Sequence, residues 1–271
     1  MHVLWNVDPV MVHLGPIELR WYGLLFAGGI LAAYLVGVWS FEQAGGSREE
    51  TNRLLGYVVV GTIVGARLGH CLLYEPGYYL RHPLEIVAVW RGGLASHGGV
   101  AGIVVAVWLF GRRTGRSALW LLDRVAVGAP LAAACIRVGN FFNSEIIGRP
   151  SNVPWAVVFA RVDMQPRHPA MLYEAAAYLV IFAAMVLLER RTTLRERQGA
   201  LTGVLLVLVF GARFVIEFLK EPQEAFEAAL PLDMGQLLSL PVVLIGVLLL
   251  SAAYFRSGAS TAASKTAERS G

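Results

Sequence analysis

The stretch "WYGLLFAGGILAAYLVGVW", Trp21–Trp39, contains no charged side chain. A helix needs roughly 20 mostly apolar residues to cross the hydrocarbon core of a bilayer, and this run is long enough. Because a backbone in lipid must satisfy its own hydrogen bonds, such a run forms a helix rather than an irregular segment. The stretch therefore predicts a transmembrane helix and places the chain among integral membrane proteins.

The composition of the whole chain agrees with that class. Of the 271 residues, 56% are hydrophobic and 15% are charged, whereas soluble domains carry about 25% charged residues. The formal net charge of +4 is modest, so we expect no nucleic-acid partner. The two cysteines, Cys71 and Cys135, both lie inside apolar runs, and no disulfide framework is expected.

Six further apolar runs accompany the first. The expected fold class is therefore an all-α integral membrane protein with seven transmembrane helices. Residues 1–255 should form one seven-span membrane domain, and the small, polar residues 256–271 a disordered cytoplasmic tail. The seven predicted spans are Trp21–Trp39, Leu54–Tyr74, Leu94–Phe110, Ala118–Val138, Ala170–Leu188, Ala200–Leu219 and Gly235–Phe255.

The distribution of basic residues predicts the orientation. Most arginines and lysines outside the spans fall in the loops after spans one, three and five and in the C-terminal tail. Cytoplasmic loops carry an excess of such residues. We therefore expect the N-terminus outside and the C-terminus in the cytoplasm. The basic residues on the predicted cytoplasmic side are Arg48, Arg53, Arg112, Arg113, Arg116, Arg190, Arg191, Arg195, Arg197, Arg256, Lys265 and Arg269.

Arginines inside the predicted spans are candidates for function. On insertion scales, an arginine at the centre of a bilayer costs at least about 2.5–3.5 kcal/mol, which makes function the default hypothesis. Arg137 and Arg213 are the strongest candidates, because a guanidinium fork suits phosphate. Glu217 follows Arg213 by one helical turn and shares its helix face. A self-neutralising ion pair between Arg213 and Glu217 is the alternative interpretation.

The segment "IRVGNFFNSEIIGR", Ile136–Arg149, gathers polar residues at the predicted outer end of span four. Asn140 and Asn143 are three residues apart and can share a helix face with Arg137. Their amides suit phosphate or glycerol hydroxyls. The alternative is that they only cap the end of the helix. Glu145 belongs to the same cluster of polar side chains.

Three further candidates each have a structural alternative. His97 lies in "SHGG", where glycines permit the close approach of a ligand, and it is either a base or a hydrogen-bonded structural residue. Arg67 lies in "GTIVGARLGH", whose glycines repeat every four residues and predict a close-packing helix face. Arg67 is therefore either a site residue or part of a buried pair. Tyr22 either belongs to the site or is an interfacial aromatic residue.

The chain contains no HExxH motif, no cysteine cluster and no Walker loop. We therefore expect neither a metal ion nor another cofactor. The residues alone predict an outward-facing, arginine-lined polar site at membrane depth, for which the phosphate of a membrane lipid is the natural ligand. They leave open whether the lipid is bound, moved or chemically altered.

Several motifs, in this order, resemble the prolipoprotein diacylglyceryl transferase family. The resemblance covers about Asp8 to Tyr254, nearly the whole chain, and its most specific part is the asparagine-rich stretch. The motifs are "RWYGL", "GARLGH", "WRGGLASHGG", "RVGNFFNSEIIGR", "PRHPAMLYE", "ARFVIEF" and "DMGQLLSLP".

The resemblance implies a seven-span enzyme of the bacterial inner membrane, with its active site toward the outer leaflet. Such an enzyme transfers the diacylglyceryl group of phosphatidylglycerol to the lipobox cysteine in the signal peptide of a preprolipoprotein. The products are a thioether-linked lipid and glycerol phosphate. A phospholipid transporter without chemistry is the alternative, although it would favour an internal repeat, and none is convincing here.

Residue roles follow from the resemblance by motif position. Arg137, Arg213 and His97 are the expected catalytic residues, and the domain of residues 1–255 would be the catalytic domain. The expected substrate-binding residues are Tyr22, Asn140, Asn143, Glu145, Gly148, Arg67 and Glu217.

Overall fold

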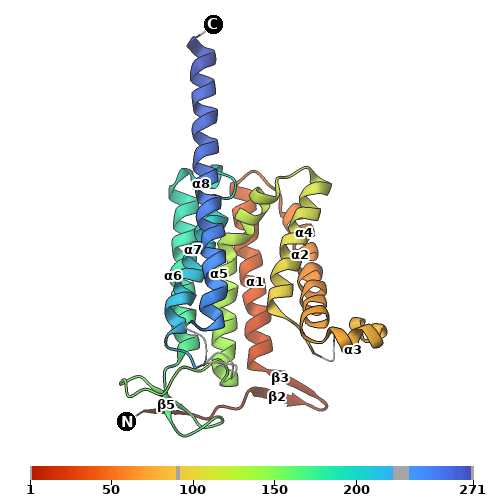
Figure 1. Ribbon diagram of the computed structural model, residues 1–271, viewed down its shortest axis with the longest axis vertical. Coiled ribbons are helices and arrows are strands. Elements are labelled where there is room, and N and C mark those ends of the chain that lie inside the picture. Colours follow the sequence, from red (N-terminus) through yellow and green to blue (C-terminus); the bar gives the residue numbers. More distant parts are fainter. Residues whose placement is uncertain (1, 90–91, 222–231, 270–271) are drawn as a thin grey trace. The chain divides into compact units, whose positions relative to one another are not determined.

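The computed structural model describes residues 2–89, 92–221 and 232–269. The chain divides into two compact units, one of residues 38–124 and one of residues 1–37 together with 125–271. Helices α1 (Trp21–Gln43) and α5 (Ala118–Asn143) each contribute residues to both units. Figure 1 labels the elements along the chain.

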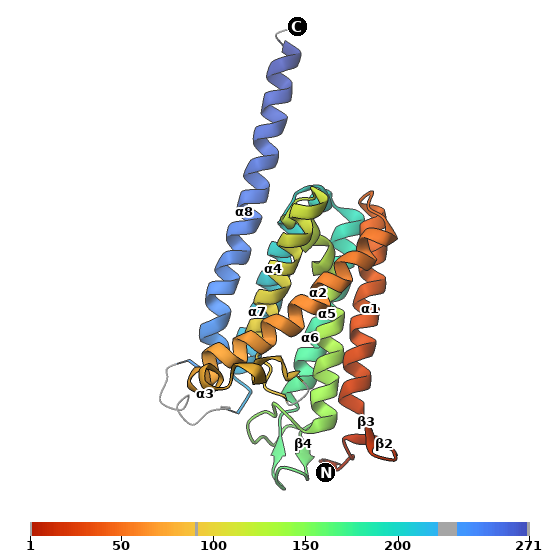
Figure 2. The same ribbon diagram turned by 90° about the vertical axis from the view of Figure 1, so that its right-hand side faces the viewer.

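The unit of residues 1–37 and 125–271 is built mainly of helices. Helix α6 packs against α7 and α7 against α8, and the two ribbon views show the three side by side (Figures 1 and 2). The unit begins with the N-terminal strands and the first part of α1, and it continues with residues 125–143 of α5. The elements that follow are β4 (Val157–Phe159), β5 (Pro166–Arg167), α6 (Ala170–Arg191), η4 (Thr193–Glu196), α7 (Ala200–Glu217) and α8 (Met234–Arg269).

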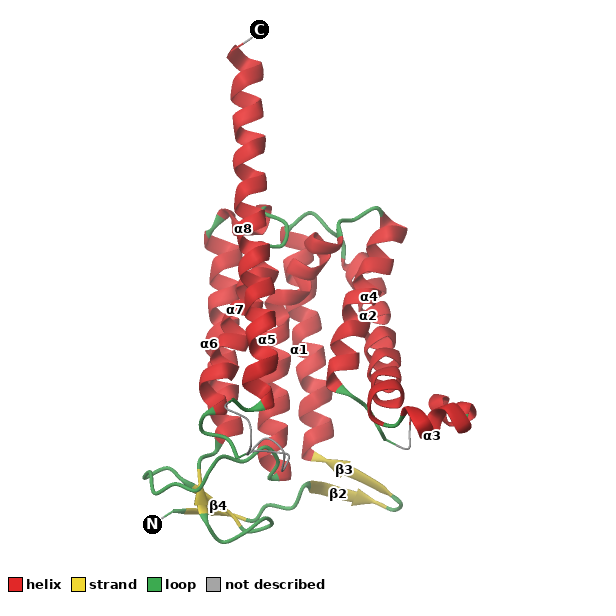
Figure 3. Cartoon of the chain, in the orientation of Figure 1, coloured by secondary structure: helices red, strands yellow, loops and turns green. Residues whose placement is uncertain are grey.

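Short strands in this unit are a feature that the all-α prediction misses. Strand β1 (Val3–Trp5) pairs in parallel with β4, which pairs antiparallel with β5. Strands β2 (Val10–Leu14) and β3 (Ile17–Arg20) form a hairpin that leads directly into α1 (Figure 3). These pairings join segments distant in sequence or only a few residues long, so local periodicity does not reveal them.

The unit of residues 38–124 centres on two helices. These are α2 (Arg48–Gly69), which continues into the π-helical turn η1 (His70–Tyr74), and α4 (Ser96–Thr114). The short elements between them are α3 (Pro76–Arg81) and the 3-10 turn η2 (Pro83–Val87). Ser47 caps the start of α2 with a capping box, in which the Ser47 side chain accepts the Glu50 N–H and the Glu50 side chain accepts the Ser47 N–H.

Glycines bring α2 and α4 into close contact, as their four-residue repeat predicts. A Cβ atom on Gly61 would lie 2.6 Å from the carbonyl oxygen of Gly102, and one on Gly69 would lie 2.8 Å from Cα of Gly98. A Cβ atom on Gly65 would collide with the Gly98 carbonyl oxygen. The prediction of a close-packing face is therefore confirmed.

Six helices in the described part of the chain are long and apolar enough to cross a membrane. They are Trp21–Gln43, Arg48–Tyr74, Ala118–Asn143, Ala170–Arg191, Ala200–Glu217 and Met234–Arg256. The remaining predicted span forms α4, which begins with the polar Ser96 and His97 and ends with Arg112 and Arg113. These polar ends lower the mean hydropathy of α4, and it is not among the six.

Helix α8 runs further than the predicted seventh span. The structure continues it through Arg269, whereas the sequence predicts a disordered tail from Arg256 onward. The tail is rich in alanine and contains lysine, glutamate and arginine, which have favourable helix propensities. In Figure 1, the C-terminal part of α8 extends well beyond the start of α7.

An aromatic cluster fixes the end of α5 against the strands. The indole Nε1 of Trp5 donates to the carbonyl oxygen of Phe141 at 3.1 Å, and the ring centroids of these two residues are 4.1 Å apart. Phe142 stacks on Trp21 at 4.9 Å, and Phe159 of β4 packs edge-on against Phe141. The two phenylalanines of "GNFFN" therefore anchor the segment that carries the polar candidates.

Candidate functional site

Arg137 is held on two sides within the unit that contains α5, α6 and α7. Its Nε forms an ion pair with Oε2 of Glu174 at 2.7 Å, and its Nη1 donates to Oδ1 of Asn140 at 3.1 Å. The Glu174 side chain is fully buried and that of Arg137 is 14% exposed. These contacts fix the plane of the guanidinium and leave further N–H groups of the fork for other acceptors.

Glu174 also belongs to a buried network on α6 and α7. The Nζ atom of Lys220 donates to Oε1 of Glu174 and to Oε2 of Glu217, both at 2.9 Å. With Arg137, the network contains two cations and two carboxylates, so its charges balance. Such balance is what makes buried charges tolerable.

The partner of Glu217 contradicts one interpretation of the sequence. Glu217 pairs with Lys220, three residues further along, instead of with Arg213. Among the described residues Arg213 forms no ion pair. The self-neutralising pair of Arg213 and Glu217 is therefore wrong for this structure, and the guanidinium of Arg213 keeps its donors.

The asparagine-rich segment folds back on itself after α5. Asn140 donates to Oε2 of Glu145 at 2.9 Å, and Asn143 donates to Oε1 of the same carboxylate at 3.1 Å. Ser144 and Ile146 adopt φ angles of 56° and 58°. Such left-handed conformations are uncommon outside glycine and mark a strained turn. This turn places the Glu145 carboxylate against the last turn of α5.

Two tyrosines connect the polar residues further. Tyr178 of α6 is buried, and its hydroxyl interacts with the guanidinium of Arg137 and lies in the field of Arg213. Tyr22, in the first turn of α1, interacts electrostatically with Glu145 and Arg137. The structure thus brings both predicted arginines of this unit to one tyrosine. The predicted residues gathered in this way are Tyr22, Arg137, Asn140, Asn143, Glu145 and Arg213.

Gly148 has a structural reason to lack a side chain. Its N–H donates to the carbonyl oxygen of His168 at 2.9 Å, and it forms an antiparallel bridge with Lys220. A Cβ atom here would lie 2.6 Å from the His168 oxygen and 2.7 Å from the Leu219 oxygen. Gly148 therefore lets two backbone segments close on each other beside the buried network.

Arg167 stabilises the same outer segment. Its guanidinium forms ion pairs with Asp163 at 2.5 Å and Glu221 at 2.6 Å and donates to the carbonyl oxygen of Gly148 at 3.3 Å. The hydrogen bond from Arg167 is the main cause that holds the pKa of Asp163 below its ordinary value. The same bond raises the pKa of Arg167. The pair is therefore charged near neutral pH and fixes the loop around Gly148.

Arg67 lies in the other unit and has partners of a different kind. It is buried, its Nε donates to the Ile86 oxygen at 2.8 Å, and its Nη2 donates to the Glu85 oxygen at 2.6 Å. Its Nη1 donates to the carbonyl oxygens of Gly92 and Gly93, and its guanidinium lies 5.0 Å from the centroid of the Tyr79 ring. Arg67 thus organises the connection between α2 and α4.

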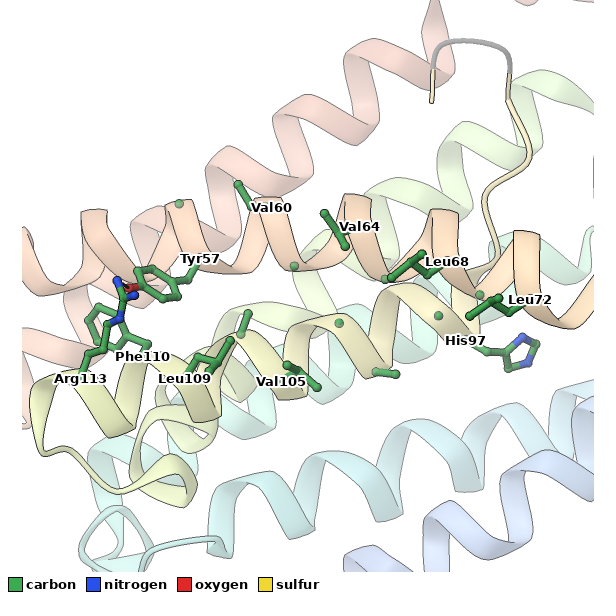
Figure 4. Close-up of a pocket in the computed structure, with 18 of the residues that line it drawn as sticks. Tyr57, Val60, Val64, Leu68, Leu72, His97, Val105, Leu109, Phe110 and Arg113 are labelled. Atoms are coloured by element: carbon green, nitrogen blue, oxygen red, sulfur yellow. Dashed lines mark hydrogen bonds between the residues drawn. The ribbon is translucent and has the colours of Figure 1, made fainter. Parts of the chain in front are cut away.

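His97 lies in the first turn of α4 and is exposed. It lines one end of a groove of about 1250 Å³ between α2 and α4 (Figure 4). In the part of the chain that the structure describes, no group of three or more His, Cys, Asp or Glu side chains could hold a metal ion.

Glu174, Lys220 and Tyr178 are absent from the predicted set. Glu174 is the single charged residue in the apolar run Ala170–Leu188, so the rule that singles out intramembrane arginines applies to it equally. Lys220 follows the predicted sixth span and resembles an ordinary interfacial lysine in the sequence. Only the fold shows that Lys220 is 2% exposed and joins two carboxylates.

Comparison with known proteins identifies relatives along nearly the whole chain. The family model of prolipoprotein diacylglyceryl transferases matches residues 9–252. A protein from Tolumonas auensis is 49% identical over 249 residues, which cover 92% of this chain and 96% of the relative. A protein from Chloroherpeton thalassium is 48% identical over 250 residues, covering 92% of this chain and 93% of the relative.

A third relative, from Bacteroides fragilis, is 42% identical over 259 residues, which cover 91% of this chain and 94% of the relative. All three are named phosphatidylglycerol–prolipoprotein diacylglyceryl transferase. The family match runs from β2 into α8 and includes the polar network around Arg137. On these grounds the chain belongs to the prolipoprotein diacylglyceryl transferase family.

Proposed function

We propose that this protein transfers the diacylglyceryl group of phosphatidylglycerol to the cysteine thiol in the lipobox of a preprolipoprotein. The observation that carries the proposal is the oriented Arg137, beside an Arg213 without an ion-pair partner among the described residues, in a chain of this family. The names of the relatives support a transferase over a phospholipid transporter.

The reaction is an alkylation of sulfur. The thiolate is the reactive form of a cysteine, whose ordinary pKa is about 8.5. Its sulfur attacks the glyceryl carbon that is bonded to the phosphate oxygen. A C–S bond forms, that C–O bond breaks, and glycerol phosphate leaves with the bonding electron pair. The thiol proton passes to a base.

Negative charge grows on the departing phosphate oxygen, and we assign its stabilisation to Arg137 and Arg213. Donors that are already oriented stabilise such charge without reorganising during the reaction. Glu174 and Asn140 supply this orientation for Arg137, because they hold its Nε and one Nη1 hydrogen. Both substrates are confined to the membrane, and holding them together lowers the barrier further.

The other predicted residues take supporting roles in this proposal. His97 accepts the thiol proton or orients the lipid. Asn140, Asn143 and Glu145 present amide and carboxylate groups to the glycerol head, and Tyr22 lies beside them. Glu217 and Gly148 support the site from the buried network and the outer loop, and Arg67 shapes the loop before His97.

The topology is also part of the proposal. Helix α4 also crosses the membrane, which brings the number of spans to seven, the N-terminus is outside, and the site faces the outer leaflet of the bacterial inner membrane. The arginines in the first turns of α2 and at the end of α4 support this orientation. A phosphatase inserted within Pro76–Leu80 should be active in the periplasm, and one fused to the C-terminus inactive. The reverse pattern would overturn the orientation.

Purified protein supplied with phosphatidylglycerol and a lipobox peptide tests the reaction. The expected product is a thioether-linked peptide, heavier by one diacylglyceryl group, together with an equal amount of glycerol phosphate. A peptide with alanine in place of the cysteine is the matched control and should give neither product. Movement of lipid between leaflets without either product would refute the transferase and support a transporter.

A further inference from the structure

The groove between α2 and α4 exists because the two backbones approach so closely. Glycines at the contact leave no side chain to fill the seam. Exposed valine and leucine side chains form the walls, among them Val64 of α2, Leu72 of η1 and Val105 of α4 (Figure 4). The result is a groove of about 1250 Å³ that runs along both helices.

Charge is confined to the two ends of this groove. Arg53 and Arg113 line one end together with Tyr57, and His97 lines the other. From Arg53 to Leu72 the helical rise amounts to roughly 28 Å, close to the thickness of a hydrocarbon core. An occupant of the middle can make only apolar contacts. An acyl chain needs nothing more, whereas an extended peptide backbone would leave its polar groups unpaired.

The two arginines keep most of their donors. Arg113 donates from Nη1 to the Tyr57 hydroxyl at 2.8 Å. Arg53 donates from Nη2 to Glu49 at 2.6 Å, in a highly exposed pair that contributes little. Arg116, by contrast, gives both Nε and Nη2 to Glu50. Planar forks with free N–H groups beside an apolar groove match an anionic head attached to a hydrocarbon chain.

We propose that this groove binds an anionic phospholipid, with the phosphate at Arg53 and Arg113 and an acyl chain along the seam between α2 and α4. The topology proposed above would place the phosphate of this lipid in the inner leaflet, at the end of the groove opposite His97. The binding itself rests only on the groove and its arginines and does not require the transfer reaction.

Photo-crosslinking in lipid nanodiscs tests the site. The probe is phosphatidylserine with a diazirine in one acyl chain, which is anionic but is not the proposed diacylglyceryl donor. A phosphatidylcholine with the same chain is the neutral comparison. Labelled peptides are mapped by mass spectrometry, and label is expected on Val60–Leu72 and Val105–Leu109, several-fold stronger with the anionic probe.

Two charge-matched double variants separate specific contacts from general attraction. Arg53→Gln with Arg113→Gln should lower labelling by the anionic probe by on the order of tenfold. The matched control, Arg48→Gln with Arg112→Gln, removes the same charge from the same two helices outside the groove and should change it little. Equal losses in both, or equal labelling of the wild type by both probes, would overturn the proposal.

A groove-filling variant leaves the arginines intact and covers the case in which the double variant does not fold. Gly56 lines the groove, and a Cβ atom there meets nothing within 4 Å. Gly56→Leu should therefore fold and reduce the labelling. Gly28→Leu on α1 is the matched control, because its Cβ also meets open space and Gly28 does not line the groove. Undiminished labelling of Gly56→Leu would contradict an acyl chain in the seam.

Discussion

Arg67 and Arg137 both interrupt apolar helices, but the structure treats them differently. Arg67 is 4% exposed, and the acceptors of its hydrogen bonds are backbone carbonyls of the segment between α2 and α4. Arg137 is held by a carboxylate on α6 and an amide on its own helix. Carbonyl partners make an arginine a scaffold for a loop. A carboxylate that orients one edge leaves the rest of the fork for a ligand.

The difference shows that an intramembrane arginine is not by itself evidence of a binding site. The cost of burying the charge is offset in both cases. The two arginines differ in whether their partners occupy the N–H donors of the guanidinium or fix its orientation. Arg213 differs from both, since among the described residues it has no ion-pair partner, and it interacts electrostatically with Tyr178.

The largest effect on turnover should follow from replacing Arg137 or Arg213. In Arg137→Lys and in Arg213→Lys the charge remains but the planar fork is lost, so two phosphate oxygens cannot be bound at once. We expect kcat to fall on the order of 100-fold or more, with a smaller rise in KM. Initial rates against phosphatidylglycerol concentration in detergent measure this.

Gel filtration of both lysine variants supplies the folding control. Arg112→Lys, in the last turn of α4, is the matched substitution and should keep normal turnover. Near-normal kcat in Arg137→Lys and Arg213→Lys would make these arginines structural, and the contrast with Arg67 would disappear.

Arg67→Met should affect stability more than turnover. The substitution leaves the carbonyl oxygens of Glu85, Ile86 and Gly92 without their donor, at a cost of about 2–4 kcal/mol. We expect a lower melting temperature in detergent, while kcat per folded molecule stays within about threefold of the wild type. An unchanged melting temperature with lost turnover would mean that Arg67 contacts the lipid.

Gly65→Ala tests the packing that presents Arg67 and His97. The added methyl collides with the backbone at Gly98, and overpacking of this kind costs about 1–3 kcal/mol. Thermal unfolding should show the loss. Gly28→Ala is the control and should be neutral, because its Cβ meets nothing within 4 Å. Equal stability of the two variants would contradict a tight seam between α2 and α4.

The smallest effect concerns the pH dependence of the outer loop. The pKa of Asp163 is lowered by the hydrogen bond from Arg167, so the unfolded chain takes up this proton first as pH falls. The stabilisation is fully present above the ordinary aspartate value of about 4 and is lost as pH falls through the lower folded value. The melting temperature of Asp163→Asn should therefore fall less steeply from neutral to acid pH than that of the wild type. Parallel curves would show that the pair contributes nothing.

Much of the helical framework could be predicted from sequence because each span is a local signal. Helices α1, α5, α6 and α7 begin at Trp21, Ala118, Ala170 and Ala200, the same residues as the predicted spans. Hydrophobic runs end where a polar or charged side chain would otherwise enter lipid. The glycine repeat of α2 predicts its packing for the same reason, since the spacing lies within one helix.

The rest depends on contacts between distant segments. Glu217 lies on the same face of α7 as Arg213, yet it pairs with Lys220. The ammonium of Lys220 also pairs with Glu174 of α6, so it lies between the two carboxylates. The chemical importance of Glu174 likewise arises from Arg137 on α5. Helical periodicity describes one helix at a time and cannot assign such partners.

The parallel pairing of β1 with β4 has a consequence for biogenesis. Val3 pairs with Val157, so more than half of the 271 residues are synthesised between the two strands. The backbone N–H and C=O groups of β1 therefore stay unpaired with β4 until several helices have been inserted. Trp5 cannot anchor Phe141 before that point. The C-terminal end of α5, with its asparagines and Arg137, is therefore assembled late, and a chain stalled midway through insertion would carry Arg137 without the strands that hold this end of the helix.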